Sequence, residues 1–311
     1  MTLKPRIALL GTGIMGCPMA RNLAAAGFDT AAWNRSDTRH QALAEAGIHV
    51  MPTPADAVRD RDVVIVMLSS GPVCKEILFG DFHKPAQGCQ GAVHAMKPGA
   101  LLIVMSSIGR NEAIDLAAHS QTLGLEWLDA PVSGGEKGAI EGTLSIMAGG
   151  TTEAFERAIP ILAAMGRPVH IGPAGTGALA KLVNQLTVAT TIAAVSEAMT
   201  LAEVGGADPA RVREAMLGGF AASCILEQHG QRMLDRNFTP GGPSRHQLKD
   251  TRAACDVANE LGLELPLLKL TDQLFSDLVD AGGGDLDHSA LLLEVRRRNR
   301  LDQEVLKKPD S

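Results

Sequence analysis

The chain has 311 residues, of which 45% are hydrophobic and 21% are charged, and its formal net charge is −6 at pH 7. That length and apolar fraction can bury a sizeable core, and they favour two domains over one. The acidic balance removes any electrostatic reason to expect nucleic acid or an anionic membrane as a partner.

Cysteine usage and the N-terminal sequence indicate the compartment. The cysteines are odd in number and contain no CxxC pair, so neither a disulfide framework nor a zinc site is predicted, nor any other metal site; they are Cys17, Cys74, Cys89, Cys224 and Cys255. The N-terminus has no basic region followed by a long apolar run, and no later segment is expected to stay apolar over about 18 residues. These features predict a soluble, cytoplasmic protein.

The first motif is a glycine-rich turn between a strand and a helix. Residues 6–10 form a short apolar run, and residues 15–26 have helical periodicity. In the GxGxxG between them, Gly11 allows the turn, Gly13 lets the backbone approach a pyrophosphate, and Gly16 lets helix and strand pack closely. A glycine-rich turn without a ligand is the alternative. The expected dinucleotide contacts in this loop are Gly11, Gly13, Ile14, Met15 and Gly16.

The end of the second predicted strand, residues 30–33, indicates which dinucleotide binds. About twenty residues past the glycines, an Asp or Glu would hydrogen-bond a ribose 2′-hydroxyl and repel a 2′-phosphate. This chain has Asn34, Arg35 and Ser36 there, and an amide, a guanidinium and a hydroxyl suit a phosphate dianion. We therefore predict NADP over NAD. Asp37 is a neighbouring negative charge that opposes this reading, and the less favoured alternative is that Arg35 is a surface arginine without a ligand.

Further apolar runs alternate with helical stretches along the first half of the chain. Residues 63–67 and 101–105 read as buried strands, and residues 110–122 read as a helix. The alternation predicts an α/β domain with a Rossmann-type doubly wound parallel sheet. Ligands bind beyond the carboxyl ends of such strands, so we expect a cofactor cleft lined by Met67, Leu68, Ser69, Ser70, Ser106 and Ser107, although loop serines are more often turn formers. Residues 80–99 are glycine-rich and aperiodic, which predicts a surface loop.

A second glycine-containing turn follows the strand that ends at Asp129. Ser133, Gly134 and Gly135 offer a hydroxyl and flexible backbone whose N–H groups can converge on an anion. Such a turn need not bind anything, and the sequence leaves both readings open.

Residues 181–203 contain neither proline nor glycine and form the longest predicted helix. Lys181, Asn184 and Gln185 are spaced i, i+3 and i+4, so a helix places all three on one face. An ammonium and two carboxamides on a mostly apolar helix are costly to bury without a purpose. The alternative is a solvated first turn outside the packed part of the helix.

Together these motifs resemble the β-hydroxyacid dehydrogenase family. The resemblance covers nearly the whole chain and is carried in order by GTGIMGCPMARNLAAAG, DAPVSGGEKGAIEGTLSIMAGG, GTGALAKLVNQ and the LKD at residues 248–250. The family includes 3-hydroxyisobutyrate dehydrogenase and tartronate semialdehyde (2-hydroxy-3-oxopropionate) reductase, and it is related to 6-phosphogluconate dehydrogenase. Within it, KLVNQ, GGFAASCILE, MLDRNFTPG and DHSALL are most similar to the tartronate semialdehyde reductases.

The resemblance implies a catalytic role for the start of the long helix. Lys181 matches the catalytic lysine, which stabilises the carbonyl oxygen and exchanges a proton with it. Residues 133–135 match the loop that holds the substrate carboxylate, and Asn184 and Gln185 match a carboxamide pair beside the lysine. The implied reaction is hydride transfer between NADP(H), or NAD(H), and a short β-hydroxy acid or its semialdehyde.

The resemblance also implies the domain organisation. We expect a Rossmann-type NADP-binding domain over residues 1–173, a connecting helix over 174–204, and an all-helical substrate and dimerisation domain over 205–311. Ser107 matches a cofactor-contacting Ser or Thr, and Lys249 matches a lysine that reaches the nicotinamide from the second domain. The last third of the chain agrees, because it has no period-2 run and its predicted helices are 209–218, 249–261, 266–281 and 289–299. Family members associate as homodimers or homotetramers, and the same is expected here.

The chain departs from the family pattern near the expected site. Gly242 stands where family members commonly have phenylalanine, and Arg245 and His246 add polarity with no obvious role. The tartronate semialdehyde reductases carry an acidic residue where this chain has Asn34. Both departures leave the choice of substrate and cofactor open, as does the length of the loop at residues 80–99.

Three functions follow from these features. The leading one is a tartronate semialdehyde reductase, with 3-hydroxyisobutyrate dehydrogenase or another short semialdehyde reductase, acting on succinic semialdehyde or glyoxylate, as the nearest alternative. An imine reductase shares the fold, but that branch usually has Asp or Tyr where this chain has Lys181. A cofactor-binding module without turnover is the third, and the retention of Lys181, Ser133 and Asn184 disfavours it.

Overall fold

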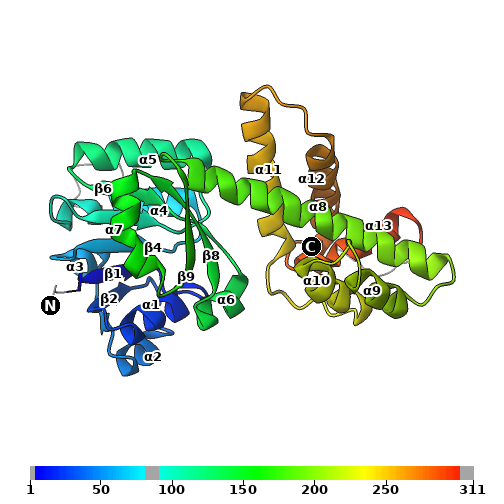
Figure 1. The fold of residues 1–311 in the computed structure, drawn as a ribbon, viewed down its shortest axis with the longest axis horizontal. Helices are drawn as coiled ribbons and strands as arrows, with labels where there is room; N and C mark the ends of the chain where they lie inside the picture. The colour runs from blue at the N-terminus through cyan, green and yellow to red at the C-terminus, as the bar shows by residue number, and fades with distance from the viewer. Residues whose placement is uncertain (1–3, 81–90, 302–311) are drawn as a thin grey trace. The chain divides into compact units, whose positions relative to one another are not determined.

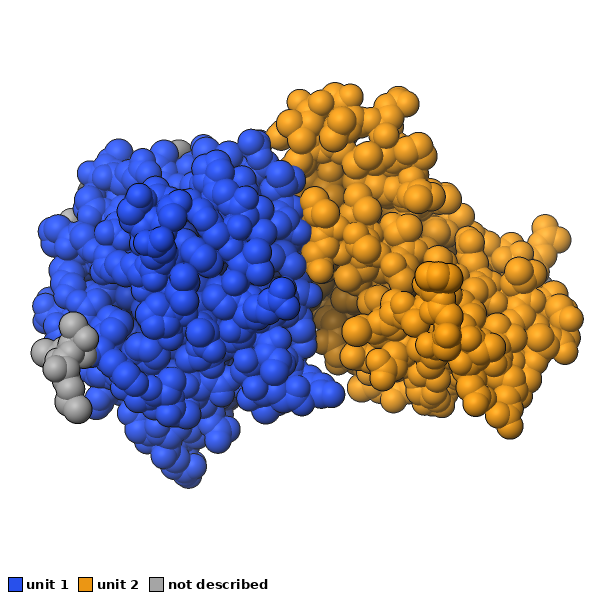
Figure 2. Space-filling model, viewed as in Figure 1, with its two compact units in different colours: residues 1–181 blue, residues 182–311 orange. Residues whose placement is uncertain are grey.

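The computed structural model describes residues 4–80 and 91–301. It divides into two compact units, residues 1–181 (unit 1) and residues 182–311 (unit 2), which Figure 2 shows in blue and orange. Figure 1 labels the helices and strands. Each unit has its own hydrophobic core.

Unit 1 is a mixed sheet with helices on both faces (Figure 1). The strands run in the order β3-β2-β1-β4-β5-β6-β8-β7, and β9 also pairs with β8. The strands are β1 (Ile7–Leu10), β2 (Thr30–Trp33), β3 (His49–Val50), β4 (Val63–Val66), β5 (Leu101–Val104), β6 (Glu126–Asp129), β7 (Val132–Ser133), β8 (Leu144–Gly150) and β9 (Gly166–Gly172). The helices are α1 (Gly16–Ala25), α2 (His40–Glu45), α3 (Pro54–Val58), α4 (Gly71–Phe79), η2 (Ala92–Ala95), α5 (Arg110–Thr122), α6 (Gly135–Glu141) and α7 (Thr152–Leu162).

The strands from β3 to β6 are parallel, and β1 lies between β2 and β4 in register. The sheet ends in a different way, because β8 is antiparallel to both β6 and β7. The predicted class, an α/β doubly wound sheet followed by an all-helical part, is confirmed. The carboxyl ends of β1, β2, β4 and β5 therefore lie at one edge, where a dinucleotide binds in such folds.

Successive residues of the central strands enter opposite cores, as the two-residue period of a strand requires. In β4, Val63 and Ile65 face a core that contains Leu23 of α1 and Leu162 of α7. Val64 and Val66 face the other core, which contains residues of α3, α4 and α5. The continuous apolar runs in the sequence therefore reflect burial on both faces.

The expectation of a surface loop over residues 80–99 was wrong for its second half. Residues 81–90 lie outside the described part of the chain. Beyond them, Ala92–Ala95 form a 3₁₀ turn, and Ala92 and Val93 are buried against α3 and α4. The short AVHA run has no periodicity long enough to be recognised, which explains the error.

Unit 2 is built from helices around a core that includes Phe275, Leu278 and Leu291. Its helices are most of α8 (Thr176–Val204), α9 (Pro209–Leu217), α10 (Cys224–Leu234), α11 (Ser244–Glu260), α12 (Pro266–Leu278), the π-turn η3 (Val279–Gly283), the 3₁₀ turn η4 (His288–Ala290) and α13 (Leu291–Arg298). Local signals start several of them. The side chains of Asp208 and Ser223 accept hydrogen bonds from the first turns of α9 and α10, respectively.

α8 is 29 residues long, and two glycines, Gly205 and Gly206, follow its end. By length and composition alone it could cross a membrane, so the expectation that no segment stays apolar over about 18 residues was wrong. One such helix is weak evidence for a membrane span, because the core helix of a soluble protein meets the same criteria. Ala189, Ile192 and Val195 of α8 are buried in the core of unit 2, as such a helix requires.

Candidate active site

The glycine turn of unit 1 connects β1 to α1 and is closely packed. Gly11 has a φ of +96°, and a Cβ there would lie 2.3 Å from the carbonyl oxygen of Met67, so glycine is required. A Cβ on Gly16 would lie 1.9 Å from the carbonyl oxygen of Gly11, whereas one on Gly13 would meet no atom within 4 Å. The backbone at Gly13 is thus approachable, as a bound pyrophosphate requires.

Thr12, between the first two glycines, supports the fit of a dinucleotide. Its side chain is fully buried, and its Oγ1 has no hydrogen-bond partner among the described residues. A buried hydroxyl without a partner is uncommon, and a polar group of a bound ligand would satisfy it. The Thr12 N–H donates to Asn34 Oδ1 at 3.1 Å, which ties the glycine turn to the end of β2.

Asn34 organises the loop in which the ribose phosphate was predicted. Its Nδ2 donates to the carbonyl oxygen and to Oγ of Ser36, both at 3.0 Å. The Asn34 carboxamide is therefore engaged with the protein, while Arg35 and Ser36 are exposed. The prediction of a 2′-phosphate contact rests on these two exposed side chains.

The loops after β4 and β5 are linked by a serine that sequence reasoning treated as a cleft residue. Ser106 is fully buried, and its Oγ accepts a hydrogen bond from the Leu68 N–H at 2.7 Å. It thus holds the backbone of the β4 loop and was wrongly expected to line a cleft. Met67, Leu68 and Ser107 are partly exposed and stay candidates for cofactor contact.

The predicted carboxylate loop lies at the end of the short strand β7. Ser133 is half-buried and pairs with Ser145 of β8. Gly134 and Gly135 are exposed, with φ of +132° and +61°, and they lead into α6. Both glycines adopt backbone conformations that side chains rarely adopt, as an anion-binding turn of this type requires.

Lys181 lies in the second turn of α8 and is the last residue of unit 1. It is half-buried, as is Asn184 one turn later, while Gln185 is buried. The alternative of a solvated first turn does not hold for these residues. Lys181 belongs to the same unit as Ser133 and the glycine turn.

The carboxamides of Asn184 and Gln185 are arranged by hydrogen bonds within unit 2. Gln185 Nε2 donates to Asp250 Oδ2 at 2.8 Å, and Asn184 Nδ2 donates to Gln185 Oε1 at 3.0 Å. Gln247 adds a bond from its Nε2 to the Gln185 carbonyl oxygen at 3.2 Å. The Asp250 carboxylate accepts the hydrogen bond, so the amide nitrogen of Gln185 must face it. The amide oxygen of Gln185 then faces Asn184, whose amide nitrogen donates to it. Sequence reasoning missed Asp250 and Gln247, because 65 and 62 residues separate them from Gln185.

The segment before α11 explains the departure from the family at Gly242. A Cβ at this position would lie 2.6 Å from Nε2 of His288, so the imidazole occupies the space of a side chain. Burial lowers the pKa of His288 to about 4, which keeps the ring neutral near pH 7. Arg245 forms an ion pair with Asp285, and the exposed Lys249 forms one with Asp250.

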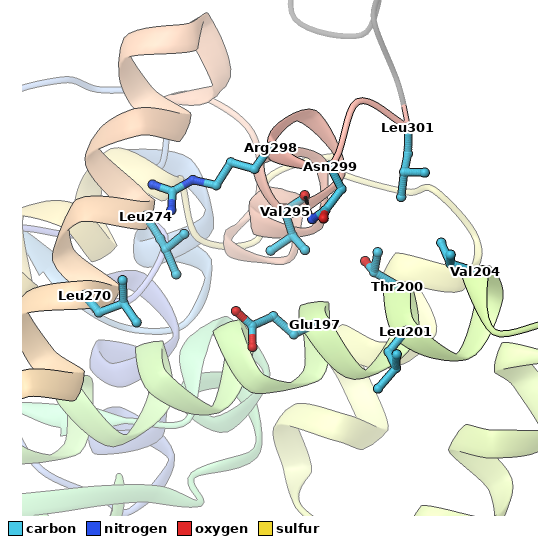
Figure 3. A pocket seen from close by; sticks show the side chains of 10 residues that line it. All are labelled: Glu197, Thr200, Leu201, Val204, Leu270, Leu274, Val295, Arg298, Asn299 and Leu301. Atoms are coloured by element: carbon cyan, nitrogen blue, oxygen red, sulfur yellow. Dashed lines mark hydrogen bonds between the residues drawn. The ribbon is translucent and has the colours of Figure 1, made fainter.

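Unit 2 also contains a pocket of about 400 Å³, which Figure 3 shows. None of the predicted site residues lines it. Its walls come from the last part of α8, from α12 and from the region of α13: Glu197, Thr200, Leu201, Val204, Leu270, Leu274, Val295, Arg298, Asn299 and Leu301.

Two family models match adjacent parts of the chain. The first, described as the NAD binding domain of 6-phosphogluconate dehydrogenase, matches residues 6–175. The second, described as NAD-binding of NADP-dependent 3-hydroxyisobutyrate dehydrogenase, matches residues 175–295. The fold and the glycine turn therefore define an NAD(P)-dependent oxidoreductase.

Individual relatives match over nearly their full length. The 2-hydroxy-3-oxopropionate reductase of Escherichia coli (strain K12) is 40% identical over 95% of this chain and 99% of its own. The 3-sulfolactaldehyde reductase of the same organism is 34% identical over 93% of this chain and 95% of its own. A solved structure of Mycobacterium tuberculosis 3-hydroxyisobutyrate dehydrogenase with L-serine is 30% identical, with a TM-score of 0.83 over 94% of this chain and 100% of that one. The chain belongs to the NAD(P)-dependent β-hydroxyacid dehydrogenase family, as its motifs indicated.

Proposed function

We propose that this protein reduces tartronate semialdehyde (2-hydroxy-3-oxopropionate) with NADPH, and that Lys181 is its general acid. The observation that carries the proposal is the presence, in one unit, of the dinucleotide turn, the Ser133–Gly135 loop and a half-buried Lys181. The identity of 40% to a 2-hydroxy-3-oxopropionate reductase supports the choice of substrate.

The chemistry follows from these residue types. When bound, NADPH supplies a hydride to the aldehyde carbon. Lys181, as an ammonium ion, stabilises the negative charge that develops on the carbonyl oxygen and donates a proton to it; as a neutral amine it accepts a proton in the reverse direction. Ser133 and the backbone N–H groups of Gly134 and Gly135 hold the substrate carboxylate, and such positioning is worth several kcal/mol.

The carboxamides on the next turn of α8 orient the lysine and the substrate. Asn184 and Gln185 follow Lys181 at the spacing of one helical turn, so they lie on the same side of α8. The chain of hydrogen bonds from Asp250 through Gln185 to Asn184 supports this role, because it fixes the orientation of both amides. Lys249 is proposed to contact the nicotinamide side of the cofactor.

The proposed cofactor is NADP, with NAD as the alternative. Arg35 can pair with a 2′-phosphate, and the Ser36 hydroxyl can donate to it. Asn34 supports the proposal because it bonds both to the glycine turn and to Ser36, the residue that follows Arg35. Further proposed contacts are Gly11, Gly13, Ile14, Met15, Gly16, Met67, Leu68 and Ser107.

We propose a cytoplasmic homo-oligomer with NADP-binding residues 1–173, a connecting helix over 174–204 and a substrate and dimerisation domain over 205–311. A stripe on α8 supports association with a second copy. Its members recur at alternating intervals of four and three residues, as in a coiled coil, and are Thr187, Thr190, Ala194, Glu197, Leu201 and Val204. Leu201 is 75% exposed and Val204 is 63% exposed, so this end of the stripe is both apolar and uncovered.

The reaction is tested by initial rates of NADPH oxidation, and separately of NADH oxidation, against a panel of aldehydes. The panel holds tartronate, methylmalonate and succinic semialdehydes, glyoxylate and 3-sulfolactaldehyde. We expect a preference for tartronate semialdehyde with NADPH. Preference for another aldehyde would replace the substrate, and preference for NADH would refute the 2′-phosphate contact. Reduction of imines in place of every aldehyde would move the protein to the imine reductases. Cofactor binding without any turnover would indicate a binding module.

The role of Lys181 is tested by Lys181→Ala. Removal of the acid should lower kcat by about 10²–10⁴-fold while the Kd for NADPH, measured by fluorescence titration, stays near the wild-type value. Lys269→Ala, which removes an exposed lysine from α12, is the matched control and should keep full activity. Turnover of Lys181→Ala close to that of the control would refute the assignment.

A further inference from the structure

A buried carboxylate joins the strand that leads to the substrate loop with the helix that carries Lys181. Asp129 is the last residue of β6 and is fully buried. Its Oδ1 accepts hydrogen bonds from the Gly175 N–H at 2.7 Å and from Trp127 Nε1 at 3.3 Å. Its Oδ2 accepts one from the Ala178 N–H at 2.8 Å. The carboxylate thus accepts from the residue that directly precedes α8, which begins at Thr176, and from the Ala178 N–H in its first turn.

The same turn of α8 is in close contact with the sheet. A Cβ on Gly177 would lie 2.3 Å from the carbonyl oxygen of Asp129 and 2.4 Å from that of Met147. A Cβ on Gly149, which pairs with Asp129 in the sheet, would lie 2.6 Å from the Gly177 nitrogen. Two glycines at this contact let the helix backbone approach the strands closely, so its first turn has little freedom to shift.

Both proposed halves of the substrate site are connected to this contact by short stretches of chain. Lys181 follows Ala178 by three residues, about one helical turn. Ser133 follows Asp129 by four residues, through Pro131, whose carbonyl oxygen accepts a bond from the Met147 N–H at 3.0 Å. Asp129 therefore links the helix that carries Lys181 to the strand that continues into the loop.

The free-energy cost of burying the Asp129 carboxylate is an argument that this residue does more than stabilise the fold. A carboxylate buried in a protein interior is expensive, and burial raises the pKa of Asp129 despite its hydrogen bonds to Gly175, Ala178 and Trp127. A serine or threonine N-cap within the α8 segment would satisfy the helix at lower cost. A distant carboxylate differs from such a cap because it also specifies the position of the helix on the sheet.

We propose that Asp129 is a positioning residue that sets the Lys181 amine against the Ser133–Gly135 loop. The proposal rests on the proposed function, in which Lys181 exchanges the proton with substrate. Asp129 itself does not contact the substrate. Misplacement of a reacting group by about 1 Å can cost on the order of 100-fold in rate, so a small shift of α8 is enough to be measured.

The test is a double-mutant cycle of Asp129→Asn and Lys181→Ala. Asparagine keeps the shape but turns an amide N–H₂ toward a backbone N–H, so the first turn of α8 loses an acceptor. We expect kcat per cofactor-binding site to fall about 10- to 100-fold, with the Kd for NADPH within about twofold of wild type. In the Lys181→Ala background the same change should have little further effect, because Asp129 acts through the lysine.

Each other result has a distinct meaning. A Lys181→Ala enzyme with wild-type turnover would refute the proposed function, whatever Asp129→Asn does. A Lys181→Ala enzyme that is impaired as expected, together with wild-type kcat per binding site in Asp129→Asn, would refute the positioning role alone. Multiplicative effects in the double variant would also refute it, since Asp129 would then act independently of the lysine.

A structural control separates positioning from stability. Asp62 is a second carboxylate of unit 1, which accepts from the Arg6 N–H at 2.7 Å and pairs with Lys97. Asp62→Asn should lower Tm and leave kcat per binding site unchanged. If Asp129→Asn does not fold, Gly177→Ala provides the second test, because its Cβ pushes α8 from the strand while the carboxylate is retained. It should reduce kcat in the same way, and unchanged kcat in folded Gly177→Ala would overturn the proposal.

Discussion

The imidazole of His288 lies against Gly242, with its Nε2 shielded from solvent and without a hydrogen-bond partner among the described residues. Burial lowers its pKa from 6.5 to about 4. Between these values the unfolded chain binds more protons than the folded one, so the free energy of unfolding rises with pH. The contribution of the neutral His288 to the free energy of unfolding is therefore fully present above about pH 6.5. It is lost as the pH falls toward 4, and the loss amounts to at most about 3 kcal/mol.

Far-UV circular dichroism in urea at pH 7, 5.5 and 4.5 tests this prediction, because unit 2 is helical. We expect His288→Gln to lose less stability on acidification than the wild type. Some dependence should remain, since burial also lowers the pKa of His229, whose ring centroid lies 6.1 Å from that of His288. His49→Gln, which replaces an exposed histidine of unit 1, should keep the full wild-type pH dependence. An equally steep loss in His288→Gln and in the wild type would contradict the prediction.

At this scale the sequence was informative where a residue acts through local geometry. Gly11 and Gly16 could be read from their spacing between strand and helix, and the structure shows why each is glycine. The roles of Asp129 and Asp250 could not be read in this way, because the groups that they bind, at Gly175 and Gln185, lie 46 and 65 residues away in the sequence. The reason for glycine at position 242 could not be predicted from the sequence either, because His288, which fills the space of its side chain, is distant in the sequence.

The element that carries Gln247 and Asp250 is α11, and its start is held by one carboxylate. Asp287 Oδ2 accepts from the backbone N–H groups of Gly241 at 3.0 Å and Gly242 at 3.2 Å, just before the helix. Its Oδ1 accepts from the Ser289 hydroxyl at 2.7 Å. Asp287→Asn should therefore lower the free energy of unfolding of unit 2 by about 2–4 kcal/mol, since a buried amide cannot accept all of these bonds. Urea titration followed at 222 nm measures the loss.

Asp285→Asn is the matched control for the α11 prediction. Asp285 lies two residues before Asp287 in the sequence, but its side chain is 87% exposed and pairs at the surface with Arg245. Its replacement should change the free energy of unfolding by less than about 1 kcal/mol. Equal effects of the two substitutions would show that Asp287 does not fasten the start of α11.

Elements with a strong local pattern were predicted well, and those without one were not. The expected helix at residues 209–218 agrees with α9, which Asp208 caps. α11 was expected from residue 249 but begins at Ser244, because the polar run after Pro243 reads as a loop until its partners in unit 2 are known. α10 was not expected as a helix, although Ser223 supplies a cap for it.

For the whole molecule, the stripe of α8, with its exposed apolar end at Leu201 and Val204, predicts association with a second copy. Leu201 is 75% exposed on this stripe and lines the pocket of unit 2 together with Leu270, which is 53% exposed (Figure 3). Coiled-coil spacing provides knobs for a facing helix, and an uncovered apolar surface of this kind gains free energy when a partner removes it from water. We expect the wild type to have a mass of at least twice 32.6 kDa in light scattering coupled to size exclusion.

Leu201→Glu should shift that mass toward the monomer, because a charge at the apolar end of the stripe is costly to desolvate in a contact with a second copy. Helix content should be unchanged, because Leu201 is 75% exposed in the single chain. Leu263→Glu is the control, since Leu263 is an exposed leucine of unit 2 outside both the stripe and the pocket. That variant should keep the wild-type mass. A monomeric wild type would refute self-association. An oligomeric Leu201→Glu variant would show that the copies meet elsewhere, and α8 would then present its stripe to another partner or to none.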